Sequence, residues 1–298
     1  MQEKTKAKIL DGKLVANKVR DGLKVRVEAI LSQRLRTPGL AVVLVGDNPA
    51  SQIYVKNKIQ ACKKVGIESF LVQFPADVPQ DDVLASIAKL NRSEAVDGIL
   101  VQLPLPKHLA TDVVLDSVDP DKDVDGLHPL NLGYLAAGRQ GLRPCTPQGV
   151  MVLLEHYNIQ VNGAAAVVIG RSNLVGKPLS LMLLEKHATV TICHSRSQNL
   201  EEIARCADIL VVAAGRECMV KQSWVKPGAT VVDVGIHKRV VPGVFGAGES
   251  EIVGDVDFQE VASVASFITP VPGGVGPMTI AMLLSNTVYA YEQRAASK

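Results

Sequence analysis

The sequence has few cysteines, and they follow no metal-binding or disulfide pattern. The five are odd in number, lie far apart and include no Cys-x-x-Cys pair: Cys62, Cys145, Cys193, Cys206 and Cys218. Thiolate zinc sites and disulfide frameworks both need regularly spaced cysteines. The sequence therefore predicts neither of them, and it favours a reducing compartment.

The sequence also lacks an excess of charge of one sign and any long apolar run. Lys and Arg number 32 against 30 Asp and Glu, which gives no reason to expect nucleic acid or an anionic membrane as a partner. No run of about 18 apolar residues occurs, and the polar N-terminus lacks the apolar core of a signal peptide. We expect a globular cytoplasmic protein without a membrane partner, or an organelle form whose transit peptide has been removed.

Short apolar runs alternate along the chain with helix-length amphipathic stretches. A length of 298 residues, at roughly 150 per domain, predicts about two domains. The strands are expected at 41–46, 70–74, 96–103, 165–169, 189–193, 208–213 and 230–234. The helices are expected at 18–34, 51–65, 81–90, 148–156 and 278–293. This alternation is typical of βαβ units, so the predicted fold class is α/β with parallel sheets.

Two stretches interrupt this alternation. The polar stretch 139–144, rich in Gly and Arg, is the candidate domain boundary. The stretch 238–251 carries several glycines and prolines, and it is expected to form an irregular surface loop.

The second half contains a candidate nucleotide site. The expected strand 165–169 runs into a turn bounded by Gly170 and Gly176 and then into a helical pattern. A dinucleotide pyrophosphate lies at such a turn in Rossmann units. The standard Gly-x-Gly-x-x-Gly pattern is not met, because Ser172 stands at its second glycine. A tight strand-to-helix connection without a ligand is the alternative.

The next strand favours NADP over NAD. NAD-selective sites place a carboxylate at the end of this strand to bind the ribose 2′-hydroxyl. Here the strand ends in Cys193-His-Ser-Arg-Ser197, which has no carboxylate. Arg171 and Arg196 could instead hold a 2′-phosphate. Two arginines that simply face solvent are the alternative.

Lys58 is the candidate proton carrier of the first half. At about 100° per residue, the expected helix places it on one arc with Ser51, Tyr54 and Cys62. Burial favours the neutral form of such an amine, which suits proton transfer near neutral pH. A lysine that extends past the apolar face to water is the alternative.

Two polar side chains stand out near expected strand ends. Gln102 interrupts the apolar run Val101–Pro106, at the strand end where ligands bind in parallel sheets. Asp125, next to Gly126, ends an acidic run. That run opens like a calcium loop, but Leu132 replaces its last ligand, so calcium is not expected. A core glutamine and a solvated acidic turn are the alternatives.

Five segments together resemble the methylenetetrahydrofolate dehydrogenase/cyclohydrolase family. They are Tyr54-Val-Lys-Asn-Lys58, Val101-Gln-Leu-Pro-Leu-Pro106, Lys122-Asp-Val-Asp-Gly126, Gly170-Arg-Ser172 and Pro270-Val-Pro-Gly-Gly-Val-Gly-Pro277. The resemblance runs from about Ile9 to the final helix. It implies a folate-binding catalytic domain of 1–143 plus 277–298, and a Rossmann-like NADP domain of 144–276. The C-terminal helix would pack back on the first domain.

The resemblance also assigns roles to residues. Lys58 matches the catalytic lysine, Gln102 the residue that orients it, Asp125 the carboxylate that binds the pterin, and Tyr54 the ring that stacks on folate. Further folate-binding positions implied are Ser51, Val101, Leu103, Pro272, Gly273 and Gly276. The NADP positions implied are Gly170, Arg171, Ser172, Ser195, Arg196, Ser197 and Ile236. No metal is implied.

The activity implied by the resemblance has two steps. NADP-dependent oxidation of 5,10-methylenetetrahydrofolate gives the 5,10-methenyl compound, and hydrolysis gives 10-formyltetrahydrofolate. The resemblance further implies a homodimer formed through the nucleotide domains, a link to purine biosynthesis and no formate activation. The alternatives are a non-catalytic folate or NADP sensor and an NADP-dependent dehydrogenase of a small hydroxy acid or shikimate type.

Overall fold

The computed structural model of the chain describes residues 7–33, 35–241 and 249–296. They form two compact units, each assembled from separated segments. The described residues of Asn17–Cys145 and Ile280–Lys298 form one, called here the small-sheet unit. The described residues of Met1–Ala16 and Thr146–Thr279 form the other, called here the large-sheet unit.

The small-sheet unit is built on a parallel sheet with the strand order β3-β2-β4. Its strands are β2 (Gly39–Val45), β3 (Glu68–Phe74) and β4 (Gly98–Val101). Its helices are α2 (Pro49–Val65), α3 (Gln80–Arg92), α4 (Thr111–Asp116), α5 (Pro129–Ala136) and most of α1 (Gly12–Ser32) and α10 (Val275–Ala296). Strand β2 is buried along its whole length, as expected for an apolar central strand covered on both faces.

A buried carboxylate fastens the last helix to this sheet. Asp97, just before β4, is fully buried and accepts two hydrogen bonds of 2.6 Å from Arg36 and one of 2.7 Å from Arg294 in α10. It also accepts one from the backbone N–H of Gly39.

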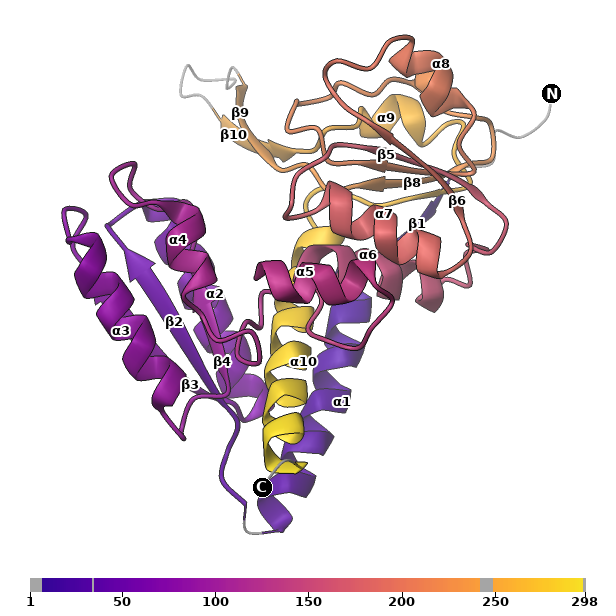
Figure 1. Cartoon of the computed structure of the whole chain (residues 1–298). Helices are drawn as coiled ribbons and strands as arrows, with labels where there is room; N and C mark the ends of the chain where they lie inside the picture. Colours follow the sequence, from indigo (N-terminus) through magenta and orange to yellow (C-terminus); the bar gives the residue numbers. More distant parts are fainter. Residues whose placement is uncertain (1–6, 34, 242–248, 297–298) are drawn as a thin grey trace. The chain divides into compact units, whose positions relative to one another are not determined.

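Helices α1 and α10 lie side by side in this unit (Figure 1), joined by the ion pair of Arg26 with Glu292.

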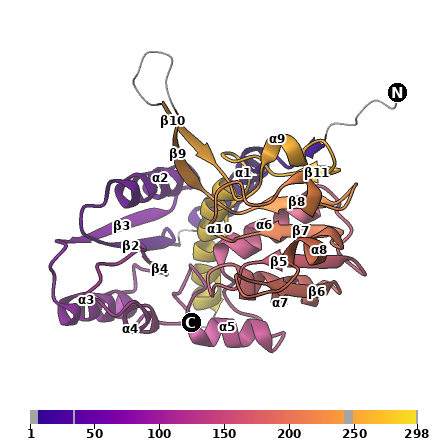
Figure 2. The ribbon, with the colours of Figure 1, turned by 90° about the horizontal axis from the view of Figure 1, so that it is seen from above.

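The large-sheet unit is built on a six-stranded parallel sheet with the order β1-β11-β8-β7-β5-β6. Figure 2 shows β11, β8, β7, β5 and β6 lying side by side in this order. The strands are β1 (Lys8–Ile9), β5 (Ala165–Ile169), β6 (Thr189–Cys193), β7 (Ile209–Val212), β8 (Thr230–Asp233) and β11 (Phe267–Ile268). The helices are α6 (Cys145–His156), α7 (Gly176–Glu185), α8 (Leu200–Arg205), α9 (Phe258–Val261) and the short 3₁₀ helix Gln222–Trp224.

The predicted α/β class with parallel sheets is confirmed, and each expected strand and helix is present with ends shifted by a few residues. Helices α4, α5, α8 and α9 and the short strand β1 were not expected. The compact units also differ from the expected domains at the N-terminal segment. That segment lies in the large-sheet unit, because β1 pairs in parallel with β11.

The expectation of an irregular loop over 238–251 is wrong for its two ends. They form an antiparallel pair, β9 (His237–Val241) with β10 (Glu249–Val253), in which Arg239 lies opposite Glu251 and forms an ion pair with it. Opposite charges at facing positions stabilise such a pair. The glycines and prolines that suggested a loop fall at 242–248, outside the described residues.

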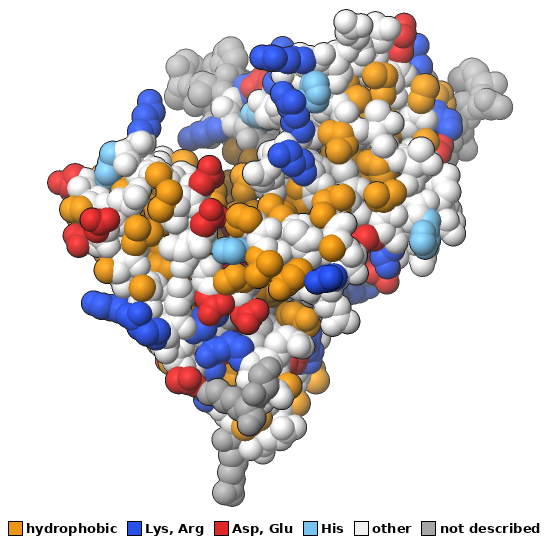
Figure 3. Space-filling view, viewed as in Figure 1, with side chains coloured by type: hydrophobic (Ala, Val, Ile, Leu, Met, Phe, Trp, Pro, Cys, Tyr) orange, Lys and Arg blue, Asp and Glu red, His pale blue; other side chains and the backbone are white. Residues whose placement is uncertain are grey.

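In the part of the chain that the structure describes, no helix is long and apolar enough to cross a membrane. Figure 3 shows both basic and acidic side chains on the visible face, in keeping with the nearly balanced charge of the sequence.

Candidate active site and dinucleotide site

Lys58 is positioned by a helix with well-defined ends. Helix α2 begins after Asn48, whose side-chain oxygen accepts hydrogen bonds from the N–H groups of Ala50 and Ser51, and it ends at Gly66 in the left-handed conformation. The Nζ of Lys58 donates a hydrogen bond of 3.0 Å to Oε1 of Gln102. Burial is the main cause of a lowered Lys58 pKa, which favours the neutral amine.

Gln102 directs its amide oxygen toward that amine. It follows β4 directly, and its side chain is buried, with 9% exposed. Its Nε2 donates a hydrogen bond of 2.7 Å to the carbonyl oxygen of Leu103, while Oε1 accepts from Lys58. Because the nitrogen is engaged next to the strand end, the oxygen is the group presented to Lys58.

Asp125 completes this cluster on the same unit. Burial raises its pKa, whereas the nearby charge of Lys58 lowers it. The next residue, Gly126, has a φ of 73°, and a side chain there would collide with the backbone of Arg143. The segment that carries Asp125 is therefore closely packed, and the structure brings Lys58, Gln102 and Asp125 together.

A buried lysine, Lys122, holds the segment that carries Asp125 in place. Lys122 has 2% of its surface exposed, and its Nζ donates three hydrogen bonds to the carbonyl oxygens of Leu90, Asn91 and Ser93 at the end of α3. A cation at a helix C-terminus satisfies carbonyls that have no partner within the helix. Lys122 is thus an anchor of the loop that ends in Asp125.

Cys145 belongs to the same cluster, although no sequence pattern indicated it. Its thiol is buried, donates a hydrogen bond to the carbonyl oxygen of Val124 and has a pKa raised by burial and by Asp125. The side-chain nitrogen of Asn286 donates to the same carbonyl. Cys145 stands just after the expected boundary stretch, where an isolated cysteine had no pattern to mark it.

The other expected folate positions have different environments. Ser51 and Val101 are buried, Leu103 is half-buried, and the Tyr54 ring is 43% exposed one turn before Lys58. Pro272, Gly273 and Gly276 belong to the large-sheet unit, where the carbonyl oxygen of Gly273 accepts a hydrogen bond from the N–H of Lys13.

The large-sheet unit places the expected dinucleotide turn at a reversal of strand order. Strand β5 has β6 on one side and β7 on the other, and ligands bind beyond the carboxyl ends of the strands at such a point. Side chains at Gly170 and Gly176 would collide with the carbonyl oxygens of Ala213 and Gly170, so both positions need glycine for close packing. The N–H of Gly170 donates to the carbonyl oxygen of Cys193 at the end of β6.

The residues expected around a 2′-phosphate lie on the turns after β5 and β6. Arg171 and Ser172 follow β5 and are exposed. After β6, Ser195 and Arg196 are exposed, and the hydroxyl of Ser197 accepts a hydrogen bond from the N–H of His194, which closes the turn. Ile236 is 55% exposed after β8. These polar turns without a carboxylate fit an NADP 2′-phosphate.

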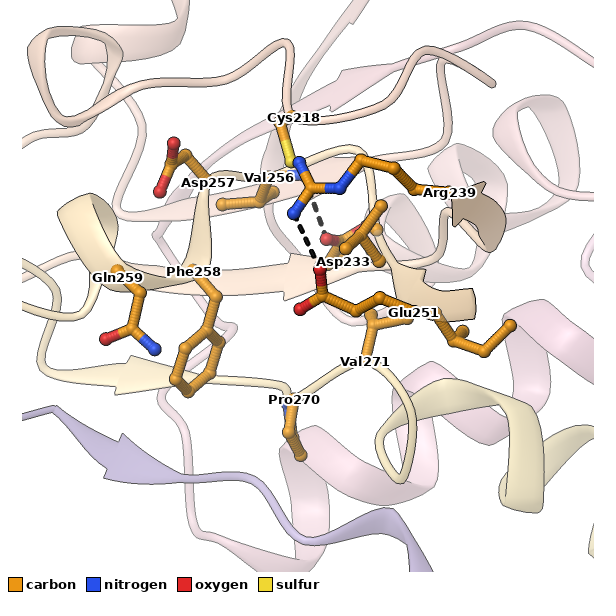
Figure 4. Close-up of a pocket in the computed structure, with 13 residues that line it drawn as sticks. Cys218, Asp233, Arg239, Glu251, Val256, Asp257, Phe258, Gln259, Pro270 and Val271 are labelled. Carbon is orange, nitrogen blue, oxygen red and sulfur yellow. Dashed lines mark hydrogen bonds and ion pairs between the residues drawn. The ribbon is translucent and has the colours of Figure 1, made fainter. Parts of the chain in front are cut away.

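A separate pocket of about 250 Å³ lies beside the β9–β10 pair (Figure 4). Its lining includes Asp233, Phe258, Pro270 and the ion-paired Arg239 and Glu251. Pro270 and Val271, from the segment 270–277 singled out in the sequence, line it, whereas the candidate catalytic and dinucleotide-binding residues do not. No group of three or more His, Cys, Asp or Glu side chains suited to a metal ion occurs among the described residues.

Comparisons with known proteins cover nearly the whole chain. Residues 10–125 match the family model "Tetrahydrofolate dehydrogenase/cyclohydrolase, catalytic domain", and residues 144–295 match its NAD(P)-binding domain. The bifunctional protein FolD of Nitrosospira multiformis is 52% identical over 290 residues, which are 97% of this chain and 98% of that protein.

Two solved structures are similar to this one. The bifunctional dehydrogenase/cyclohydrolase FolD of Campylobacter jejuni has a TM-score of 0.90 and 48% identity, over 97% of this chain and 99% of that chain. The Trypanosoma brucei enzyme, described as complexed with NADP cofactor and inhibitor, has a TM-score of 0.91 and 38% identity over the same shares.

Proposed function

The chain belongs to the tetrahydrofolate dehydrogenase/cyclohydrolase family, and from that premise we propose how its residues perform the two activities. It is a bifunctional enzyme that uses NADP to oxidise 5,10-methylenetetrahydrofolate and then hydrolyses the 5,10-methenyl product to 10-formyltetrahydrofolate. The sensor and small-substrate alternatives are therefore not retained. The pair of Lys58 with Gln102, joined over 3.0 Å, is the observation that carries the proposed mechanism.

Lys58 is the proposed proton carrier of the hydrolysis. Water adds to the methenyl carbon and loses its first proton, which leaves a hydroxyl group on that carbon. The bond from the carbon to N5 then breaks as N5 gains a proton, and the hydroxyl group loses its proton to solvent and becomes the formyl C=O. A neutral amine can accept the first proton at Nζ and donate it to N5. Burial lowers the Lys58 pKa and so maintains a neutral fraction, and Gln102 holds the amine in one orientation.

The remaining folate contacts are proposed from the family positions. Asp125 accepts hydrogen bonds from the pterin ring, and Tyr54 stacks on folate with its exposed ring face. Ser51, Val101 and Leu103 are proposed to line the same site. Pro272, Gly273 and Gly276, in a loop of the large-sheet unit that is poor in side chains, are folate positions proposed from the family relationship alone. Cys145 is a buried neighbour of Asp125, and its thiol is proposed to keep water away from the buried side of the Asp125 carboxylate.

The dehydrogenase step needs placement of two substrates more than proton transfer. When bound, NADP⁺ supplies the acceptor for the hydride that leaves the one-carbon bridge. Gly170, Ser172, Ser195 and Ser197 are proposed to line the phosphate and ribose site. Arg171 and Arg196 are proposed to bind the 2′-phosphate, and Ile236 to lie beside the nicotinamide.

We further propose that the enzyme is a cytoplasmic homodimer joined through its nucleotide-binding domains. Its product carries a formyl group in transferable form, which suits formyl transfer in purine biosynthesis. These proposals rest on the family relationship. Analytical ultracentrifugation of the purified protein tests the dimer, which a monomer at micromolar concentration would refute.

A time course at 340 nm with 5,10-methylenetetrahydrofolate tests the function. The protein is supplied with NADP⁺ or NAD⁺, and the methenyl compound is quantified after acidification. Formation of NADPH with little residual methenyl compound is expected. Accumulation of the methenyl compound would contradict the proposed role of Lys58 in the hydrolysis. Faster turnover with NAD⁺ than with NADP⁺ would refute the proposed 2′-phosphate site.

A further inference from the structure

Asp255 holds the backbone of a distant loop with both of its carboxylate oxygens. It follows β10, and its side chain is fully buried. Oδ2 accepts hydrogen bonds from the N–H groups of Ala214 at 2.6 Å and Gly215 at 3.0 Å, and Oδ1 accepts one from Arg216 at 2.9 Å. These three residues come just after β7, at the carboxyl edge of the large sheet.

Successive backbone N–H groups that point to one place form an anion-binding nest. In this chain the nest after β7 is filled by the chain's own carboxylate, so it holds no phosphate. Its effect is to fix the path of residues 214–216 beside Ala213, whose carbonyl oxygen packs against Gly170 of the dinucleotide turn.

Asp255 also reaches the loop after β8. Its Oδ1 lies 2.7 Å from Nε2 of His237, the residue that follows Ile236 and begins β9. One buried carboxylate therefore connects two of the loops that follow strands of the parallel sheet. Both loops lie at the edge where ligands of such sheets bind.

A second aspartate interlocks with the first. Asp233, at the end of β8, accepts hydrogen bonds from the N–H groups of Gly235, Asp255 and Val256. A side chain at Gly235 would collide with the Asp255 carboxylate, and one at Gly254 with the Asp233 carboxylate. The close fit leaves Asp255 little freedom to move.

We propose that Asp255 is a positioning residue for NADP. Its carboxylate holds in place the two loops that border the nicotinamide half of the dinucleotide site. The inference rests on the NADP site proposed above. Asp255 acts through the backbone of residues 214–216 and through His237. Removal of its hydrogen bonds would leave the folate-binding unit unchanged and loosen the NADP site.

The two activities of the enzyme separate this role from a general loss of stability. Hydrolysis of the methenyl compound requires no NADP, so it reports on the folate site and on folding. In Asp255→Asn one carboxylate oxygen becomes an N–H donor that faces backbone N–H donors. We expect the KM for NADP⁺ to rise roughly tenfold, while the cyclohydrolase rate measured without NADP stays within about twofold of wild type.

Asp257→Asn is the matched control. Asp257 lies two residues along the same segment, but it caps α9 and pairs with the exposed Lys221. We expect its NADP⁺ KM to equal that of the wild type. An unchanged KM in Asp255→Asn, or a cyclohydrolase loss as large as the dehydrogenase loss, overturns the inference.

Variants of His237 test the same connection with a smaller disturbance, including the case in which Asp255→Asn fails to fold. His237→Phe removes the nitrogen that faces Asp255, and we expect the NADP⁺ KM to rise roughly threefold. His237→Gln restores an N–H donor and should restore the KM, and equal values for both variants would contradict the inference. A wild-type protein without NADP-dependent oxidation would instead refute the proposed function.

Discussion

The side-chain nitrogen of Lys58 lies 3.0 Å from the side-chain oxygen of Gln102, whose own nitrogen is bound to the carbonyl oxygen of Leu103. A neutral amide oxygen orients the amine without adding a negative charge. It therefore fixes the direction of Nζ while leaving the pKa of Lys58 lowered by burial. A carboxylate in the same place would orient the amine but hold it protonated.

Replacement of Lys58 separates the two activities. Lys58→Met keeps most of the side-chain volume and removes the proton carrier. We expect the cyclohydrolase rate to fall at least about a hundredfold and the dehydrogenase rate to fall less, as measured with the methenyl and methylene substrates. Lys56→Met, on the exposed face of the same helix, is the control and should change neither rate. Equal loss of both activities in Lys58→Met would contradict this division.

The pH dependence of the cyclohydrolase reports the charge on Lys58. A base works when unprotonated, so the rate should fall as the pH drops below the Lys58 pKa, which burial lowers from its ordinary value. Gln102→Glu places a carboxylate beside the ammonium, stabilises the protonated form and so raises this pKa. We expect the rising limb of the pH profile to move up by about one pH unit or more.

Gln102→Met is the control for this shift, because it removes the hydrogen bond without adding a charge. Its profile should be lower at every pH, with no upward movement of the limb. A Gln102→Glu profile whose limb stays in place would show that Lys58 is not the group that titrates.

Selectivity for NADP should depend on Arg196. Arg196→Ala removes the proposed charged contact with the 2′-phosphate, so it should raise the KM for NADP⁺ at least about tenfold and leave the KM for NAD⁺ unchanged. Arg205→Ala is the control, since Arg205 is an exposed arginine in α8 that pairs with Glu201. Parallel increases for both cofactors in Arg196→Ala would place the arginine away from the 2′-phosphate.

Stability of the small-sheet unit should depend on Asp97. Asp97→Asn leaves Arg36 and Arg294 without their charged partner, and breaking such a buried pair costs about 3 kcal/mol of unfolding free energy. Urea unfolding measures this loss. Glu292→Gln, which disrupts the exposed pair with Arg26, should cost less than about 1 kcal/mol. Similar losses in both variants would mean that Asp97 is less important than its burial indicates.

The sequence predicted local features well, since they depend on neighbouring residues. The period of α2 placed Lys58 on the arc that carries Cys62, and the apolar run before Gln102 placed that residue at a strand end. Their roles stay predictions, but the side chains do lie together. The alternation of apolar runs likewise sufficed for the fold class and for most strands.

Features that depend on distant pairing could not be predicted. Cys145 joins Asp125 in a cluster closed by Asn286, which lies 141 residues farther along the chain. Asp255 binds backbone groups about 40 residues away, and no local pattern distinguishes it from a surface aspartate. The β9–β10 pair was missed because the glycines and prolines in the sequence 242–248 outweighed the signal of the short strands on either side.

The pairing of β1 with β11 also affects how the chain can fold during synthesis. The six-stranded sheet contains residues 8–9 and 267–268, and Asp97 of the other unit gains Arg294 as a partner. The large-sheet unit is therefore complete only after β11 and the start of α10 have left the ribosome, and the small-sheet unit only after the rest of α10 has left it, although domains commonly fold as they emerge. Cutting the chain at the boundary near residue 144 would yield two fragments that each lack a part of their own unit, so the enzyme cannot be divided there into two independent halves.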